Sequence, residues 1–182
     1  MNCYILIGGR STRMGQSKVP LFLDRVLAAA RPVFDAIIAV QRAGGEAAPI
    51  ETIYEKAHAD QAPAFGVVCA LQHAAADGFI LAVDYPLVTS AVLRYIEARF
   101  RSSLAPVVAP RWNGKVQMLC AAYAGSMAAV LQERLAAGRY DLRGLANHAE
   151  ILEETDLRAQ FPGEPLMNVN TPDDWERAMA FR

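Results

Sequence analysis

Three short runs of uninterrupted apolar residues constrain the fold of this chain more than any other feature. They occupy residues 3–7, 36–40 and 79–83, and none of them alternates with polar residues. An apolar run of five residues between turn signals is typical of a strand buried on both faces, and such strands occur mainly in parallel sheets covered by helices. The runs therefore predict a parallel sheet enclosed between two helical layers.

The segments between these runs have the spacing of helices and of shorter strands. Apolar residues at helical spacing predict helices over 21–30, which Pro32 ends, and over 65–76. Further helices are expected over 91–100 with Thr89 as N-cap, over 126–137 and 142–148, and from Thr171-Pro172 onward. Further strands are expected over 52–54, 106–109 and 151–152. A turn at 113–114 should lead into Val116 and Gln117. Strands and helices that alternate without repeats predict an α/β fold, a three-layer Rossmann-like fold with a mostly parallel sheet.

The composition limits the class of protein. A chain of 182 residues with 53% hydrophobic residues suits one domain over residues 1–182. A protein with a net charge of −1 lacks the strongly basic surface that binding to a nucleic acid requires. Its three widely spaced cysteines suggest neither a disulfide framework nor a zinc site. The first apolar run is too short for a signal segment or a membrane span. We therefore expect a cytoplasmic protein whose partners are neither nucleic acids nor membranes.

The first apolar run ends in a loop, residues 8–18, that is rich in glycine and positive charge. The loop holds three glycines, two arginines and one lysine, and no acidic residue. Backbone N–H groups in glycine-rich loops bind phosphate oxygens, Arg13 can hold two oxygens as a fork, and Lys18 can follow a migrating charge. The spacing matches neither a P-loop nor G-x-G-x-x-G. The loop is either an anion site or a surface turn whose cations are solvated.

Asp84 stands at the carboxyl end of the third apolar run, before Tyr85-Pro86. Carboxyl ends of parallel strands meet at one edge, so we expect Asp84 to lie over the same crevice as the glycine loop. Magnesium needs only one or two carboxylates when phosphate oxygens and water complete its shell. Asp84 is thus either the Mg²⁺ ligand or a cap for the helix that begins after Pro86.

The three histidines are isolated in the sequence. No acidic or basic partner is spaced near His58, His73 or His148, so we interpret each as a surface or core residue and not as a catalytic one.

Several motifs together resemble one known family. The string Leu6–Gly15, closing on Lys18 and Pro20-Leu21, resembles the signature loop of nucleotidyltransferases with a GT-A-like Rossmann fold, and among these it most resembles the molybdenum cofactor guanylyltransferases. Ordered matches extend the resemblance over nearly the whole chain, at residues 62–66, 83–87, 117–121 and 168–172.

This resemblance implies an activity and its substrates. The family transfers GMP from GTP to molybdopterin with Mg²⁺, forming the guanine dinucleotide cofactor and releasing pyrophosphate. An acceptor phosphate is already anionic, so catalysis needs charge neutralisation and alignment rather than a general base. The resemblance assigns those tasks to Lys18, Arg13 and Asp84, with Asp84 as the metal ligand. It would also permit transient contact with molybdoenzymes or cofactor-synthesis proteins.

The resemblance further implies which residues bind the nucleotide. It places the triphosphate at the loop residues Ile7, Gly8, Gly9, Arg13, Gly15 and Lys18, where Ile7 replaces the alanine of the family. A carboxylate can accept both hydrogens on the edge of guanine, and Glu55 falls where the family has aspartate. Gln41 stands where the family has asparagine, and Gly66 is retained although Ala62 replaces a glycine. Gln41 and Glu55 could instead be ordinary exposed polar residues.

The acceptor side follows from a C-terminal motif. Asn168 and Asn170 resemble the Asn-x-Asn-Thr-Pro of the family, and amides suit the edge of a pterin because they both donate and accept. The resemblance adds Gln117 and Arg143 as contacts of the acceptor. Asn168 and Asn170 could otherwise serve a turn and a helix cap.

Two other functions stay open at this point. One is a related nucleotidyltransferase that uses CTP, or that uses a sugar or alcohol phosphate as acceptor. The other is a chaperone or regulatory subunit that binds a nucleotide or cofactor without turnover.

Overall fold

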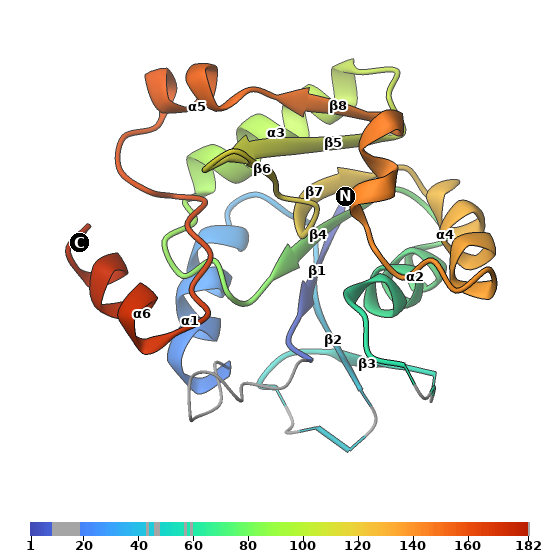
Figure 1. Cartoon of the computed structure of the whole chain (residues 1–182). Coiled ribbons are helices and arrows are strands. Elements are labelled where there is room, and N and C mark those ends of the chain that lie inside the picture. Colours follow the sequence, from blue (N-terminus) through green and yellow to red (C-terminus); the bar gives the residue numbers. More distant parts are fainter. Residues whose placement is uncertain (9–18, 43, 46–47, 57, 59, 182) are drawn as a thin grey trace.

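The computed structural model describes residues 1–8, 19–42, 44–45, 48–56, 58 and 60–181. These residues form an eight-stranded sheet in the order β3-β2-β1-β4-β7-β5-β6, with β8 paired to β5 (Figure 1). The strands are β1 (Asn2–Leu6), β2 (Ile37–Arg42), β3 (Thr52–Glu55), β4 (Gly78–Ala82), β5 (Val107–Trp112), β6 (Lys115–Val116), β7 (Cys120–Tyr123) and β8 (Ala149–Leu152).

The sheet is mostly parallel, as the apolar runs predict. β1 pairs in parallel with β2 and β4, β2 with β3, and β5 with β8. β7 runs antiparallel between β4 and β5, and β6 returns antiparallel to β5 through the expected turn. β7 is not among the expected strands, although it lies within residues 118–124, which are an uninterrupted apolar run.

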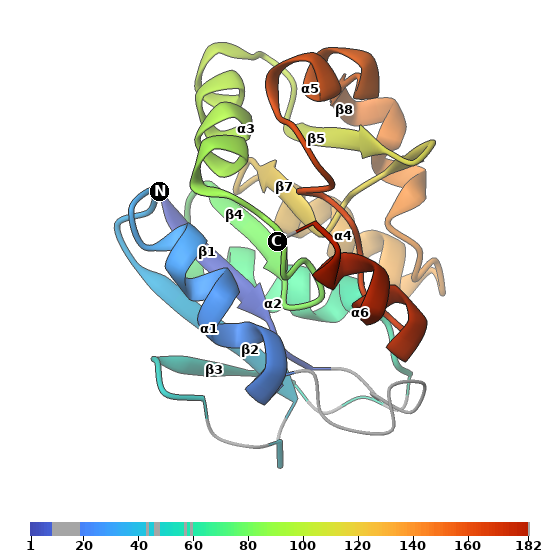
Figure 2. The same cartoon turned by 90° about the vertical axis from the view of Figure 1, so that its left-hand side faces the viewer.

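Helices cover both faces of the sheet and make the three predicted layers (Figures 1 and 2). One face packs against α1 (Val19–Ala30), α3 (Ser90–Ser102), α5 (Glu154–Gln160) and α6 (Pro172–Met179), and the other against α2 (Pro63–Ala74), α4 (Met127–Ala136) and the 3-10 helix η1 (Arg143–His148). Alternate strand residues enter the two cores, so that Cys3 and Ile5 face α1 while Tyr4 and Leu6 face α2.

Two helical segments differ from expectation. The segment expected as a helix over 142–148 is η1, one short 3-10 helix, and α5 has no counterpart among the expected helices. The predicted caps are confirmed, because Thr89 Oγ1 accepts from Val92 N at 3.3 Å and Thr171 forms a capping box with Asp174. No helix in the described ranges is both long and apolar enough to cross a membrane.

The strand order reverses between β1 and β4, where open α/β sheets form a ligand-binding crevice. The chain leaves β1 toward β2 and β3 on one side, then returns to place β4 on the other side, so the strand order reverses between these two strands. Ligands of open α/β sheets bind beyond the carboxyl ends of the strands at such a reversal. Gly8 and Asp84 follow β1 and β4 closely and so stand on either side of this crevice.

Candidate functional site

Asp84 is held by backbone contacts at the centre of this edge. Val83 N donates to Leu6 O at 3.1 Å, which extends the pairing of β4 with β1 to the residue before Asp84. Asp84 O in turn accepts from Val169 N at 2.8 Å, so the segment that leads to α6 is attached to the end of β4. Because Thr89 caps α3, the alternative of Asp84 as its cap is wrong. Asp84 is therefore a half-buried carboxylate at the head of the crevice.

The donor set at Asp84 fits a magnesium ion that is shared with phosphate. Within the part of the chain that the structure describes, no group of three or more His, Cys, Asp or Glu side chains could hold a metal ion. A single carboxylate suffices for Mg²⁺ only when phosphate oxygens and water complete the coordination. An ion at Asp84 would therefore depend on a phosphate-bearing substrate.

Neutral groups surround this carboxylate. Burial, and secondarily the negative charge of Asp84, raise the pKa of the Tyr85 phenol well above its usual range, and the same two causes raise the pKa of the Cys120 thiol. Both groups consequently keep their protons at neutral pH. They can donate hydrogen bonds beside Asp84 but cannot replace it as an anion.

Three residues predicted for the acceptor gather around Tyr85. Tyr85 Oη donates to Gln117 Oε1 at 2.9 Å and also shares a hydrogen bond with the side chain of Asn168. Asn170 Nδ2 donates to Asn168 Oδ1, and Gln117 Nε2 donates to Trp112 O at 3.0 Å. We call Tyr85, Gln117, Asn168 and Asn170 the amide cluster. Tyr85 is not among the predicted site residues, although it follows the predicted metal ligand directly.

The antiparallel β7 explains how Gln117 reaches this place. Leu119 O accepts from Ala82 N at 2.7 Å, so the amino-terminal end of β7 meets the carboxyl end of β4. The segment before β7 therefore lies at the same edge as Asp84, as Figure 2 shows for β4 and β7.

The N-terminal cap of α6 does not use the side chains of Asn168 and Asn170. Asp174 Oδ2 accepts from the backbone N of Asn170 and of Thr171, at 3.1 and 3.0 Å, and Thr171 Oγ1 accepts from Asp174 N at 3.1 Å. The cap of α6 is thus made by Thr171 and Asp174. The simple capping explanation accounts for Thr171 but not for either asparagine side chain.

Arg143 does not join the amide cluster by any described interaction. It is the exposed first residue of η1. Tyr140, three residues earlier, donates to Asp60 Oδ2 at 2.7 Å, which places this segment beside the loop after β3. Contact between Arg143 and the acceptor stays a prediction.

The residues predicted to read the base lie on the other side of the crevice. The register of β2 and β3 places Gln41 opposite Tyr54 and Arg42 opposite Glu55. A Cβ on Gly8 would lie 3.5 Å from Arg42 N, and a Cβ on Gly66 would lie 3.0 Å from Glu55 Oε1. The carboxyl ends of β1, β2 and β3 and the first turn of α2 thus bring Gly8, Gln41, Glu55 and Gly66 into one group. Together with Arg42 and His58, which contact Glu55, we call this group the carboxylate cluster.

Gln41 and Glu55 are not the exposed polar residues of the alternative explanation. Gln41 is 6% exposed, and its Oε1 is buried without a hydrogen-bond partner among the described residues. The Glu55 side chain is 10% exposed. A buried polar atom without a hydrogen-bond partner lowers folding stability by about 1–3 kcal/mol. Gln41 Oε1 is therefore suited to accept a hydrogen bond from a donor on a ligand.

The carboxylate cluster includes two residues that the sequence analysis did not assign. Glu55 Oε2 lies 3.3 Å from His58 Nε2 and 3.7 Å from Arg42 Nε. The interpretation of His58 as lacking an acidic partner is therefore wrong. The two residues are three apart in the sequence, and the strand expected over 52–54 gives no reason for their side chains to meet.

The remaining predicted residues divide into two groups. Gly9, Arg13, Gly15 and Lys18 lie outside the described residues, and their roles stay predictions. The Ile7 side chain packs in the core against α1, and its N–H donates to Val40 O at 3.1 Å. Because the side chain and the N–H of Ile7 are both engaged, only its carbonyl can face a nucleotide.

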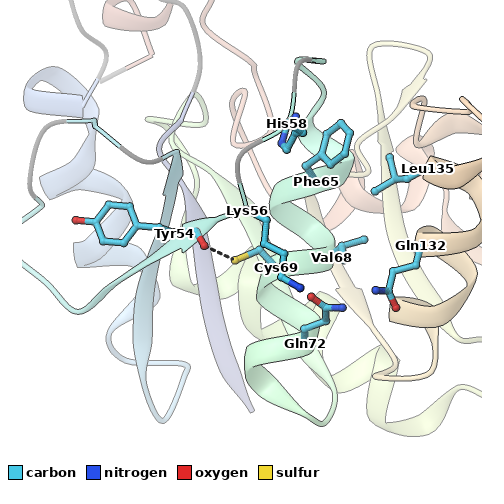
Figure 3. A pocket seen from close by; sticks show the side chains of 9 residues that line it. All are labelled: Tyr54, Lys56, His58, Phe65, Val68, Cys69, Gln72, Gln132 and Leu135. Carbon is cyan, nitrogen blue, oxygen red and sulfur yellow. Dashed lines mark hydrogen bonds between the residues drawn. The ribbon is translucent and has the colours of Figure 1, made fainter.

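A separate pocket of about 330 Å³ opens beside the site, between the end of β3, α2 and α4 (Figure 3). None of the predicted site residues lines it. Its wall consists of Tyr54, Lys56, His58, Phe65, Val68, Cys69, Gln72, Gln132 and Leu135. His58 and Phe65 lie at the start of α2, where the pocket adjoins the carboxylate cluster.

Comparison with known proteins places this architecture among nucleotide-transferring enzymes. Residues 3–154 match the MobA-like NTP transferase domain family. A probable molybdenum cofactor guanylyltransferase of Thermococcus gammatolerans is 29% identical, over 93% of this chain and 94% of its own length.

Two solved structures share the fold. The molybdopterin-guanine dinucleotide biosynthesis protein A of Archaeoglobus fulgidus has a TM-score of 0.83 and 23% identity, over 98% of this chain and 96% of its own. The 2-C-methyl-D-erythritol 4-phosphate cytidylyltransferase of Thermus thermophilus has a TM-score of 0.65 and 14% identity, over 97% of this chain and 96% of its own. At these identities the likeness establishes the fold alone.

Proposed function

This chain belongs to the MobA-like NTP transferase domain family and is a nucleotidyltransferase, and from that premise we propose that it transfers GMP from GTP to molybdopterin. The products are the guanine dinucleotide form of the cofactor and pyrophosphate. The guanylyltransferase relative from Thermococcus gammatolerans supports the proposal by its name. The observation that carries it is the carboxylate of Glu55, nine-tenths buried and facing Gly66.

The Glu55 carboxylate suits guanine better than it suits the other common bases. Guanine presents two donors on one edge, N1–H and the exocyclic amine, and a carboxylate accepts both. Adenine and cytosine present a ring acceptor at the corresponding place, which a carboxylate would repel. The buried Gln41 Oε1 offers one further acceptor nearby. We therefore assign base recognition to Gln41 and Glu55, with Gly66 providing room.

The acceptor binds on the opposite side of Asp84. Asn168, Asn170 and Gln117 carry side-chain amides, which can pair with the mixed donors and acceptors of a pterin edge. We assign Arg143 to the acceptor phosphate by resemblance alone, because its segment is attached through Tyr140 to the loop after β3. This arrangement leaves the acceptor phosphate facing the α-phosphorus of a nucleotide whose base lies at the carboxylate cluster.

The reaction then needs alignment and charge neutralisation. The acceptor phosphate attacks the α-phosphorus in line, a new P–O bond forms, and the bond to pyrophosphate breaks. Asp84 would hold Mg²⁺, which neutralises charge on the phosphates when it is bound. Gly8, Gly9 and Gly15 donate backbone N–H groups to the triphosphate beside the carbonyl of Ile7. Arg13 and Lys18 offset the charge that moves onto pyrophosphate.

The wider setting follows from the same proposal. Residues 1–182 act as one nucleotidyltransferase domain in the cytoplasm. The substrates are the small molecules GTP and molybdopterin. Protein partners are limited to transient contacts with molybdoenzymes or cofactor-synthesis proteins, and neither nucleic acid nor membrane takes part.

A thermal-shift series with GTP, CTP and ATP, each with Mg²⁺, tests the choice of base. At one hundred times Kd, binding stabilises the fold by about 2.7 kcal/mol. For a chain of this size, that free energy raises Tm by about 5–10 °C. GTP should give the largest rise. An equal or larger rise with CTP would contradict the guanine assignment and favour a cytidylyltransferase.

A further inference from the structure

The two oxygens of the Glu55 carboxylate have different surroundings. Oε2 is the atom that contacts both His58 Nε2, at 3.3 Å, and Arg42 Nε, at 3.7 Å. Oε1 faces Gly66, where an added Cβ would lie only 3.0 Å away. One oxygen therefore faces Arg42 and His58, and the other lies against Gly66, where it leaves little room for a side chain.

Arg42 is itself fixed at the end of β2. The register places it opposite Glu55, and its Nη2 donates to Asp60 O at 2.9 Å. The guanidinium thus joins the end of β3 to the loop that follows it. An arginine held by two different oxygens keeps its planar group in one orientation.

His58 is fixed from three directions. Its Nε2 faces Glu55, its Nδ1 forms a hydrogen bond with Asp60 O, and its ring stacks on Phe65 with centroids 3.4 Å apart and planes at 17°. Figure 3 shows the two rings facing each other at the start of α2. Because Phe65 immediately precedes Gly66, the ring that supports His58 and the glycine that faces Glu55 occupy one helical turn.

Tyr140 fastens this arrangement to a second part of the chain. Its Oη donates to Asp60 Oδ2 at 2.7 Å, and its ring lies 5.7 Å from that of Phe65. The loop after β3 is therefore attached to β2, to α2 and to the segment before η1. A loop that only connected a strand to a helix would not need these attachments.

We propose that His58 and Arg42 are positioning residues that hold the Glu55 carboxylate ready to read the edge of guanine. The inference rests on the proposed function, since Glu55 must be the group that selects the base. A glutamate has three rotatable side-chain bonds, and fixing them before binding removes an entropic cost from nucleotide recognition. His58 acts through Glu55 and contacts no reacting atom. It therefore sets affinity and choice of base, and leaves the chemical step unchanged.

Two substitutions of His58 separate its hydrogen bond from its stacking. His58→Phe keeps an aromatic ring on Phe65 but removes both ring nitrogens, the one that faces Glu55 and the one bonded to Asp60 O, whereas His58→Gln keeps an N–H donor. His73→Phe is the matched control, because it makes the same change in α2, where His73 Nδ1 lies 3.1 Å from Tyr4 Oη. Calorimetric titration with GTP or ATP in the presence of Mg²⁺ gives Kd, turnover assays give kcat and KM, and Tm without nucleotide reports on the fold.

His58→Phe should weaken GTP binding about tenfold, as expected for loss of a hydrogen bond to a charged group. Its Kd for ATP and its kcat should stay near those of the wild type. His58→Gln should recover most of the GTP affinity, and His73→Phe should leave it unchanged. A purely structural role would instead lower Tm and weaken both nucleotides together, and that result would overturn the inference.

A double-mutant cycle tests whether His58 works through Glu55. In a Glu55→Gln background, His58→Phe should weaken GTP binding no further, because the group that it positions is gone. Additive effects would overturn the inference. If His58→Phe fails to fold, Arg42→Met tests the same point at the second contact, again with an expected loss of GTP affinity alone.

The failure of this inference can be told apart from the failure of the proposed function. A wild-type protein that binds ATP as tightly as GTP would remove the guanine assignment, and this inference with it. A wild-type protein that prefers GTP, together with a His58→Phe variant that keeps the full preference, would overturn only the role of His58.

Discussion

The carboxylate cluster and the amide cluster flank the same aspartate but are built differently. The carboxylate cluster is ionic, with Glu55 beside Arg42 and His58 at the ends of neighbouring parallel strands. The amide cluster is neutral, and its members come from three distant segments that meet at Tyr85. A fixed anion suits a partner that only donates, whereas amides suit a partner that both donates and accepts. The two halves of the crevice are therefore adapted to ligands of different hydrogen-bonding character.

Asp84→Asn should have the largest effect, because Asp84 lies between the carboxylate cluster and the amide cluster and serves both. Loss of the charge that holds Mg²⁺ should lower transfer by about 10²–10⁴-fold, at about 1.36 kcal/mol for each factor of ten. Pyrophosphate release from GTP plus acceptor measures the rate. Asp77→Asn, at the amino end of β4, is the matched control, since Asn keeps the oxygen that accepts from Gly125 N at 3.0 Å. A normal rate for Asp84→Asn would place the metal elsewhere.

Glu55→Gln should impair only the carboxylate cluster. Replacing the carboxylate by an amide removes one acceptor for the guanine edge, so Kd for GTP should rise by roughly 10- to 100-fold. KM for the acceptor should not change. Calorimetry with GTP and ATP measures the loss of preference, and Glu51→Gln, at the other end of β3, serves as control. An unchanged preference for GTP would mean that another group reads the base.

Gly66→Ala should disturb the ionic half by crowding. The new methyl group would stand 3.0 Å from Glu55 Oε1 and 3.1 Å from the Leu6 side chain. Overpacking of this kind lowers folding stability by about 1–3 kcal/mol. Displacement of the Glu55 carboxylate should also lower GTP affinity about tenfold while the acceptor KM stays constant. Equal losses on both sides of the crevice would show that α2 moved as a whole.

Tyr85→Phe should have the smallest effect and should fall on the neutral half alone. The variant loses the hydroxyl that joins Gln117 to Asn168, so the acceptor KM should rise about threefold to fivefold with GTP affinity unchanged. Steady-state kinetics with varied acceptor gives this value. Tyr95→Phe, on α3, is the control. If Tyr85→Phe weakened GTP instead, the division between the two clusters would be wrong.

The same division governs how much of the site the sequence could predict. Gln41 and Asp84 follow apolar runs, and Glu55 follows the short strand expected over 52–54. Parallel strands bring such ends together, so the shared edge could be inferred from the strand pattern, whereas the roles of Gln41 and Glu55 come from the resemblance. Asn168 and Gln117 could be assigned only by resemblance, because nothing in the local pattern brings residues 84, 117 and 168 together. That contact depends on the antiparallel β7 and on the attachment of Val169 N to Asp84 O.

The residues that sequence reasoning missed have a common physical reason. Tyr85, Arg42 and His58 each act through a neighbour, and their partners are chosen by turns and by cross-strand register rather than by spacing. His58 contacts Glu55 from three residues further along the chain, beyond the end of β3. Periodicity describes which face a residue occupies, but it contains no information on which side chains meet across a turn.

The reversed direction of β7 makes one wall of the site modular. A parallel strand in that place would send its preceding segment to the far edge of the sheet. The antiparallel strand instead places residues 113–119 beside the carboxyl end of β4, where Leu119 O accepts from Ala82 N. This connection can therefore be remodelled without changing the pairing of the parallel strands β1 to β4.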